Sequence, residues 1–272
     1  MHPWLLHSRT LSIPTFAFCM VVGFAAVTLF AGYRTRAKGL DPNVCPALVL
    51  WVIPASLVGA KIFAISHHLL QGGAIPLQFW YLKRVLLGGG LIAYGGVFAG
   101  LLTAYLYMRI RKLDFLAYAD AFAPALGLGV CIMRLGCFFS GCCWGKGDFT
   151  PLAISFPIQS RAGIFQANHG HDGLFPSQLL ASMDGLIIMG ILLWLDRRMR
   201  IKGTLFLAFV VLYATARVGE DYTRFYESTE QMLSLTYNQW ISLAAISVSG
   251  FIAARFAARP EKVQMEGPGG KG

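Results

Sequence analysis

DAFAPALGLGVCIMRLGCFFSGCCWGK, residues 120–146, is long and apolar enough to lie in a bilayer, yet it contains Asp120, Pro124, Arg134 and five glycines. An arginine at mid-membrane costs roughly 2.5–3.5 kcal/mol on insertion scales, which makes it a functional candidate. Glycine and proline at this density favour a broken or re-entrant segment, which persists in lipid only where protein or a wet cavity surrounds the backbone. We therefore expect Arg134 to point into a polar pocket. The alternative is a lipid-facing helix whose arginine reaches the membrane surface.

The composition of the whole chain indicates a membrane protein. Of its 272 residues 56% are hydrophobic and 13% are charged, whereas soluble domains carry about 25% charged residues. The formal net charge of +10 does not indicate a nucleic-acid-binding protein, because the basic residues flank apolar segments and do not form one face or stripe. We expect contacts with membrane lipids and none with nucleic acid.

Seven apolar segments approach the ~20 residues needed to cross the ~30 Å hydrocarbon core. They lie at about residues 11–33, 44–66, 86–108, 115–144, 177–195, 203–222 and 239–258. The shorter segment 75–82, IPLQFWYL, is typical of an interfacial helix. The first span is too long for a cleavable signal peptide and is followed by basic residues, so we expect it to remain attached. The predicted fold is an all-α polytopic membrane protein with about seven transmembrane helices.

The distribution of basic residues predicts the orientation of these helices. Fourteen of the 23 lysines and arginines lie in the links after the first, third and fifth spans or in the tail, and six lie on the opposite side. Lys61, Arg134 and Arg217 remain inside spans. Because cytoplasmic loops are enriched in basic residues, the N-terminus is predicted outside and the C-terminus in the cytoplasm.

A single transmembrane domain over residues 1–258 and a flexible cytoplasmic tail over 259–272 are expected. The loop at 145–175 is long for a compact protein and too apolar for pure disorder, so it predicts a small extracytoplasmic cap with a function. His169 and His171 within it are candidate metal ligands, but two histidines without a third ligand more commonly are ordinary loop residues. No metal and no cofactor is expected.

A second candidate centre is YATARVGEDYTR, residues 213–224. If this span is helical, Arg217, Asp221 and Arg224 share one face, because they stand four and seven residues apart. One hypothesis is an ion pair near a helix end with no wider role. The other is that Arg134 and Arg217, with few compensating acids, bind an anionic group at membrane depth. Arginine suits phosphate because its planar fork donates two parallel hydrogen bonds.

Two further features have open interpretations. The third span, LLGGGLIAYGGVFAGLL, combines closely spaced glycines with Tyr94, which is typical either of a close-packed helix face or of a lipid-binding face. The six cysteines lie in or beside apolar segments and are interpreted mainly as packed side chains. Cys137, Cys142 and Cys143 are also candidates for a redox or acyl-accepting site, although C-x4-C-C is not a usual metal-binding spacing.

The chain resembles the bacterial prolipoprotein diacylglyceryl transferase family over most of its length. Five motifs occur in the family's order: DAFAPALGLG at 120–129, RLGCFFSGCCWGK at 134–146, FPSQLL at 175–180, YATARVGEDYTR at 213–224 and LTYNQWIS at 235–242. The resemblance implies transfer of a diacylglyceryl group from phosphatidylglycerol to the lipobox cysteine thiol of a prolipoprotein signal peptide. The implied partners are therefore phosphatidylglycerol and prolipoprotein signal peptides, and the implied location is the bacterial plasma (inner) membrane.

The residues and the resemblance together indicate a candidate site. The predicted catalytic residues are Arg134, Arg217 and Tyr94. Eleven further residues are predicted to bind substrate: Gly95, Gly96, Asp120, Gly136, Cys137, Ser140, Gly141, Gly145, Gln178, Asp221 and Arg224.

The chain departs from the family pattern at several of these positions. Tyr94 stands where the family has a histidine, Cys137 and Ser140 replace asparagines, and Cys142 replaces an acidic residue. Because thiolate is the nucleophile, some group must remove the thiol proton. A phenol with a pKa near 10 is a poor base, so Tyr94 is expected to position substrate. The alternative function is a non-catalytic relative that binds a phospholipid or a lipidated peptide.

Overall fold

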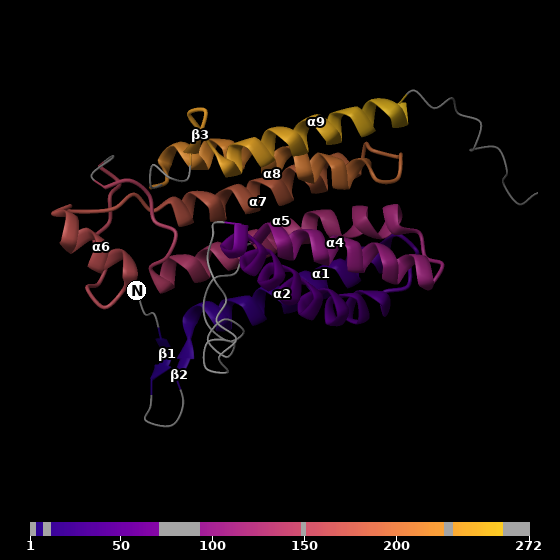
Figure 1. Ribbon diagram of the computed structural model, residues 1–272. Helices are drawn as coiled ribbons and strands as arrows, with labels where there is room; N and C mark the ends of the chain where they lie inside the picture. Colours follow the sequence, from indigo (N-terminus) through magenta and orange to yellow (C-terminus); the bar gives the residue numbers. More distant parts are fainter. Residues whose placement is uncertain (1–3, 8–11, 71–92, 148–150, 226–230, 258–272) are drawn as a thin grey trace, which may run out of the picture. The chain divides into compact units, whose positions relative to one another are not determined.

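The computed structural model describes residues 4–7, 12–70, 93–147, 151–225 and 231–257 (Figure 1). The described ranges contain eight helices: α1 (Thr15–Ala37), α2 (Val44–Leu70), α4 (Ala93–Ile110), α5 (Phe115–Ser140), α6 (Arg161–His169), α7 (Ser177–Asp196), α8 (Thr204–Thr223) and α9 (Tyr237–Ala257). Two short antiparallel hairpins accompany them: β1 (Trp4–His7) with β2 (Ser12–Pro14), and β3 (Gln231–Met232) with β4 (Leu235–Thr236).

The observed helices confirm the predicted all-α polytopic membrane fold. Five helices in the described ranges, α1, α2, α5, α7 and α9, are long and apolar enough to cross a membrane. The other two predicted spans correspond to α4 and α8. The described part of α4 begins at Ala93, and α8 carries the charged residues of the candidate site. The predicted interfacial helix at 75–82 and the tail at 259–272 lie outside the described residues.

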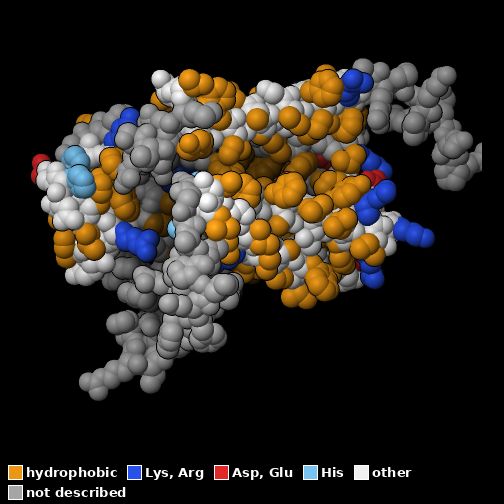
Figure 2. All heavy atoms as spheres, in the orientation of Figure 1, with side chains coloured by type: hydrophobic (Ala, Val, Ile, Leu, Met, Phe, Trp, Pro, Cys, Tyr) orange, Lys and Arg blue, Asp and Glu red, His pale blue; other side chains and the backbone are white. Residues whose placement is uncertain are grey.

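The outward faces of these helices are apolar. Leu29, Leu50, Phe98 and Phe251 are between 61% and 75% exposed, and Figure 2 shows hydrophobic side chains covering the long helices with few charged side chains among them. Water would disfavour such continuous apolar faces, whereas lipid chains match them. The orientation of the helices across the membrane stays a prediction from the basic residues.

Contacts divide the chain into two compact units, residues 1–27 with 122–272, and residues 28–121. In the second unit α2 packs against α4. Gly95 and Gly96 permit this packing, because a Cβ at Gly95 would collide with Phe63 and with the Gly59 carbonyl, and one at Gly96 would lie 3.0 Å from the Ser56 carbonyl oxygen. The two glycines therefore allow the helix backbones to approach closely.

In the first unit α8 packs against both α7 and α9, and lies between them in Figure 1. Buried side chains of α5, α7 and α8 form its apolar core: Ala123, Ile188, Leu192 and Leu205. The first part of α1 also packs on α5, because a Cβ at Gly136 would lie 2.7 Å from Cys19 Cβ. The core thus fixes the helices that carry Arg134 and Arg217.

The expectation of a break within the glycine-rich part of residues 120–146 is wrong. Helix α5 continues through Pro124 to Ser140, and the chain leaves the helix only at Gly141, where φ is +63°. The glycines serve packing: a Cβ at Gly127 would lie 2.9 Å from the Gly185 carbonyl oxygen of α7. Proline is tolerated because neighbouring helices can satisfy the freed backbone groups.

The segment predicted to form the cap is folded in its described part, and its extracytoplasmic position stays a prediction. Helix α6 begins after Ser160, whose Oγ accepts a hydrogen bond from Gly163 N at 3.0 Å, and it ends at Gly170 in the left-handed conformation. Phe156, Ala162 and Leu174 form a separate buried cluster. The cap therefore has its own hydrophobic core and is more than a mobile loop.

We predict that Gly185→Ala lowers the free energy of unfolding, because the added Cβ would lie 2.7 Å from the Gly127 carbonyl oxygen. Overpacking of this kind costs roughly 1–3 kcal/mol. Gly190→Ala, on the same helix with nothing within 4 Å of its added Cβ, is the matched control. Thermal unfolding of both variants in detergent measures the difference. Equal melting temperatures for the two variants would contradict the close approach of α5 and α7.

Candidate functional site

The centre of the site is an ion-pair network that joins α5 to α8. Arg217 Nη1 lies 2.9 Å from Glu220 Oε2 and 2.9 Å from Asp221 Oδ1. Arg134 Nη2, from α5, lies 3.8 Å from the same Glu220 oxygen. The side chains of Arg134 and Arg217 are 17% and 10% exposed, and those of the two acids are almost completely buried. The two predicted catalytic arginines are therefore brought together through a shared carboxylate.

The expectation that few acids compensate the arginines is wrong, and Glu220 is the residue that sequence reasoning missed. It stands three residues after Arg217, a spacing that places both on one helix face. With Arg224, the site holds three guanidinium groups and two carboxylates. Buried charges require such pairing, because desolvation of an isolated ion costs several kcal/mol. The network as a whole therefore retains a positive charge.

Asp221 also connects α8 to the start of α9. Thr236 Oγ1 donates a hydrogen bond to Asp221 Oδ2. Gln239 fixes Thr236 in turn, because its Oε1 accepts from Thr236 N at 3.0 Å and its backbone N–H donates to Thr236 Oγ1 at 3.1 Å. The motif at 235–242 thus orients a site carboxylate.

A cavity of about 380 Å³ lies beside this carboxylate. Two cationic side chains, Lys146 and Arg224, and one carboxylate, Asp221, provide its charged lining. The remaining lining residues are Tyr222, Phe225, Ser234, Thr236 and Gln239. Six of the eight lining side chains are charged or polar, and the net charge of the lining is positive, so the cavity suits an anionic ligand that also carries hydroxyl groups.

The segment after α5 is fixed by backbone contacts with α8 and with the residues before α7. Gly145 N donates to Phe175 O, and Lys146 N donates to Thr223 O, both at 2.9 Å. A Cβ at Gly145 would lie 2.6 Å from Thr223 O, and one at Gly141 would lie 2.6 Å from Ser160 Cβ. These predicted substrate-binding glycines therefore allow the segment to pass close to its neighbours.

Gln178 lies at the start of α7 and is completely buried. Its Nε2 donates to Cys142 O at 2.8 Å. Its Oε1, together with Ser140 Oγ and Trp144 Nε1, is buried with no hydrogen-bond partner among the described residues. Buried polar atoms normally have partners, so Gln178 and Ser140 retain capacity to bind a polar group of a ligand.

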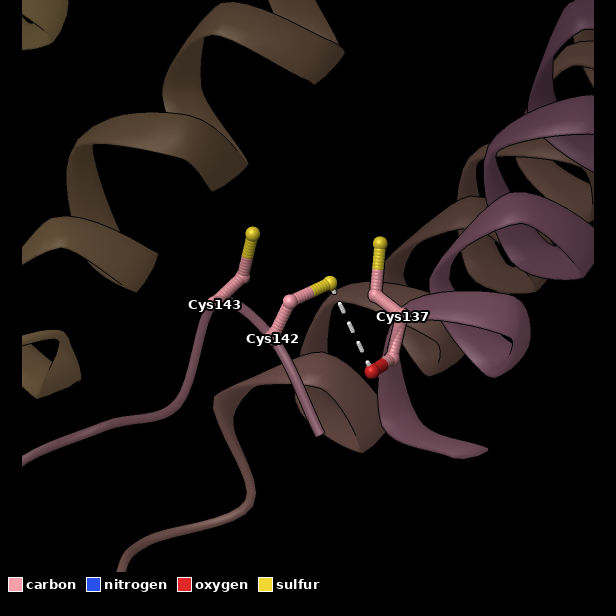
Figure 3. Close-up of side chains that lie close together, drawn as sticks. All are labelled: Cys137, Cys142 and Cys143. Carbon is pink, nitrogen blue, oxygen red and sulfur yellow. Dashed lines mark hydrogen bonds between the residues drawn. The ribbon is translucent and has the colours of Figure 1, made fainter. Parts of the chain in front are cut away.

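Three of the six cysteines converge at the end of α5. The Sγ atoms of Cys137, Cys142 and Cys143 all lie within 4.8 Å of one another, and Figure 3 shows the Cys142 thiol directed toward the Cys137 carbonyl. In the part of the chain that the structure describes, this is the one group of three side chains that could hold a metal ion. The spacing of these cysteines in the sequence did not predict a metal-binding group.

Cys142 and Cys143 follow the membrane-spanning part of α5, and their thiols have opposite shifts. Hydrogen bonds from Cys137 and Cys142 lower the pKa of Cys143, and the Arg224 and Arg134 guanidinium groups lower it further, against the effect of burial. Hydrogen bonds with Cys137 and Cys143, together with burial, raise the pKa of Cys142. One thiolate is therefore favoured at Cys143, beside two cations.

The histidines of the cap have a packing role. The His169 ring stacks on Phe165 with a centroid distance of 4.0 Å, and His169 Nδ1 lies 2.9 Å from Phe165 O. His171 lies parallel to His169 at a centroid distance of 6.2 Å. This arrangement agrees with the interpretation of both histidines as ordinary cap residues.

The remaining predicted site residues, Tyr94, Gly95, Gly96 and Asp120, belong to the second unit. The glycines pack α4 against α2, as described above, and Asp120 is buried. Participation of these four residues in the arginine site stays a prediction.

Comparison with known proteins shows which family the chain resembles. The sequence model of the prolipoprotein diacylglyceryl transferase family matches residues 3–255. Proteins named phosphatidylglycerol–prolipoprotein diacylglyceryl transferase from Frankia alni and Clostridium tetani are 29% and 26% identical to the chain, over 94% and 93% of its length. A Frankia casuarinae protein of the same name is 27% identical over 88% of the chain. The chain spans 66% and 57% of the two Frankia proteins and 96% of the Clostridium protein.

The fold and the site together define a polytopic membrane protein with a buried arginine centre compensated by two acids. Since the family match extends over nearly the whole chain, the protein belongs to the prolipoprotein diacylglyceryl transferase family. The resemblance carried by the five sequence motifs is thereby confirmed.

We predict that Glu220→Ala lowers the free energy of unfolding by about 3–5 kcal/mol, because removal of one partner leaves buried charge uncompensated. Arg134 and Arg217 would both lose the carboxylate that they share. Thr215→Ala, an exposed position on the same helix, is the control and should leave stability nearly unchanged. Thermal unfolding in detergent measures both. A Glu220 variant as stable as the control would show that the network does not hold α5 to α8.

Proposed function

We propose that the chain transfers a diacylglyceryl group from phosphatidylglycerol to the thiol of a lipobox cysteine in a prolipoprotein signal peptide, at a bacterial plasma membrane. The observation that carries the proposal is the buried network of Arg134, Arg217, Glu220 and Asp221 in a member of this family. In the reaction a C–S bond forms as the glycerol C–O bond breaks. The electron pair of that bond remains on the phosphate oxygen of the departing glycerol phosphate.

The two arginines have different roles in this proposal. Arg217 makes two ion pairs of 2.9 Å, so it is held in place by the acids. Arg134 approaches Glu220 only to 3.8 Å, which is too long for a hydrogen bond. Its planar fork is thus the better candidate to bind the phosphate. Fixed cations in a dry site stabilise charge that develops on a leaving group.

The cavity beside Asp221, which is not lined by Arg134, is the proposed place of the glycerol part of the headgroup. Lys146 and Arg224 supply positive charge there. The unpartnered polar atoms of Gln178 on α7 and Ser140 on α5 supply further hydrogen-bonding capacity for a ligand. Tyr94, Gly95, Gly96 and Asp120 keep in the proposal the substrate-positioning and substrate-binding roles that the sequence predicts for them. Gly136, Gly141 and Gly145 act through the close packing that they permit.

The alternative is a non-catalytic relative that binds a phospholipid or a lipidated peptide. The observation that favours it is the composition of the signature, where Cys137, Ser140 and Cys142 replace polar and acidic residues of the family pattern. Both hypotheses require the arginine centre, so only a measurement of turnover separates them.

We predict that the purified chain adds one diacylglyceryl unit to the cysteine of a synthetic lipobox peptide in detergent containing phosphatidylglycerol. Arg134→Ala should reduce the rate by roughly 10²–10³-fold, as for loss of one donor to a developing anion. Arg134→Lys should restore little of the lost rate, because lysine lacks the planar guanidinium group that donates two parallel hydrogen bonds. Mass spectrometry of the peptide measures the product.

Arg198→Ala is the matched control, because this arginine lies outside the site and stacks on Trp194 at 4.3 Å. Its rate should equal that of the unaltered chain. Transfer that persists unchanged in Arg134→Ala would contradict the assignment of this arginine. A folded protein that binds the lipid but transfers nothing would establish the binding function instead.

A further inference from the structure

The three-cysteine cluster has no role in the mechanism above, and the mechanism lacks a group that activates the acceptor thiol. Thiolate, and not thiol, is the nucleophile. Glu220 and Asp221, the carboxylates of the arginine centre, are engaged in ion pairs and hydrogen bonds. The cluster lies close to this centre, because Cys137 follows Arg134 by three residues on α5 and therefore shares its helix face.

The separation of the three sulfur atoms is compatible with one bound metal ion. Sulfur atoms 2.3 Å from a tetrahedral zinc ion are about 3.8 Å apart, whereas a disulfide requires about 2.05 Å. The observed separations are no greater than 4.8 Å. Small side-chain rotations would therefore bring all three sulfur atoms to metal-binding distance, and all three cysteines are free in the structure.

The backbone is shaped so that two adjacent cysteines can point to one place. Neighbouring side chains in an extended chain point in opposite directions. Here Gly141 has φ of +63° and Cys143 has φ of +61°, a conformation that is costly for a residue with a Cβ and that concentrates at functional sites. Cys142 N donates to Cys137 O at 3.1 Å, and Gln178 holds the Cys142 carbonyl. These contacts keep the turn beside the last turn of α5 (Figure 3).

The donor set selects a soft metal and leaves a coordination position open. Three thiolates suit zinc or copper(I) and do not suit magnesium or calcium. Structural zinc sites have four protein ligands, whereas catalytic zinc sites have three and keep the fourth position open. No fourth cysteine, histidine or acid joins the cluster among the described residues. Zinc with three thiolates carries one net negative charge, and Arg134 and Arg224 both interact electrostatically with Cys143.

We propose that Cys137, Cys142 and Cys143 bind one zinc ion, and that this ion takes the thiol of the acceptor cysteine as its fourth ligand. The inference rests on the proposed transferase function for its acceptor, although the metal site stands on its own geometry. Coordination deprotonates the acceptor thiol, and the proton passes to water. The zinc-bound sulfur then attacks the glycerol carbon while the C–O electron pair stays with the phosphate. Zinc remains divalent throughout, so no oxidant or reductant is needed.

The first test measures metal binding without reference to activity. The purified full-length chain is stripped with a chelator, reloaded with zinc or with cobalt(II), and analysed for bound metal by mass spectrometry. We expect one ion per chain and a sulfur-to-cobalt charge-transfer band. Cys137→Ser, Cys142→Ser and Cys143→Ser should each weaken metal binding by about tenfold or more, because each removes one of three ligands. Size-exclusion elution verifies that the variants remain folded.

Cys19→Ser is the matched control, since this free cysteine lies on α1 outside the cluster. It should bind zinc like the unaltered chain. Absence of stoichiometric metal in the unaltered chain, or equal binding by the triple serine variant, would overturn the proposal. A disulfide within the cluster, detected as a loss of two free thiols in the isolated protein, would overturn it as well.

The second test separates failure of this inference from failure of the proposed function. A lipobox peptide should alter the visible spectrum of the cobalt-loaded chain, and the same peptide with serine in place of cysteine should not. A zinc-free chain that transfers the diacylglyceryl group at the full rate would refute the zinc role and leave the transferase function intact. A zinc-loaded chain that binds the peptide thiol but transfers nothing would refute the transferase function and leave the metal site intact.

Discussion

The shared carboxylate of Glu220 is the interaction on which the first unit of this protein depends. It joins Arg217 of its own helix to Arg134 of α5, and all three charges lie in a region where water cannot solvate them freely. Removal of any one would leave a charge without compensation, at a cost of several kcal/mol. Through Asp221, Thr236 and α9 the same constraint extends to the last helix. The packing of three helices is thus coupled to the electrostatics of one site.

The segment after α5 is placed by the same constraint. It passes along the end of α8, where Lys146 N donates a hydrogen bond to Thr223 O. It also passes Phe175, two residues before the start of α7, where Gly145 N donates to Phe175 O. Gln178, from the first turn of α7, holds the Cys142 carbonyl. Any shift of α8 relative to α5 would therefore move the cysteines and the cap. A few hydrogen bonds to the backbone of this segment thus connect the packing of the apolar helices to the position of the cysteines.

Much of the fold follows from the sequence because length and apolarity are local properties. A run of about 20 apolar residues has one stable solution in lipid, which is a helix. The continuity of α5 does not follow, because Gly127 is a helix breaker or a packing residue depending on its partner, and only the structure identifies Gly185. The functional importance of Arg134 and Arg217 was predictable, because placing a charged side chain inside a membrane costs free energy. Glu220 was missed because its second partner, Arg134, is remote in sequence. The three cysteines were candidates for a redox or acyl-accepting site, but their metal-binding arrangement was not predicted, because it requires the left-handed turn at Cys143.

The compensation of the arginine centre by Glu220 and Asp221 has a consequence for the proposed reaction. Two unit charges 4 Å apart interact by about 4 kcal/mol at an effective dielectric constant of 20, close to a thousandfold in affinity. Uncompensated arginines would hold the glycerol phosphate product at least as tightly as the lipid, since the product carries more negative charge. Such binding would not lower the barrier, because only interactions stronger in the transition state than in the ground state accelerate the chemical step. Glu220 and Asp221 reduce that excess attraction, so the arginines can stabilise charge as it develops and still release the product.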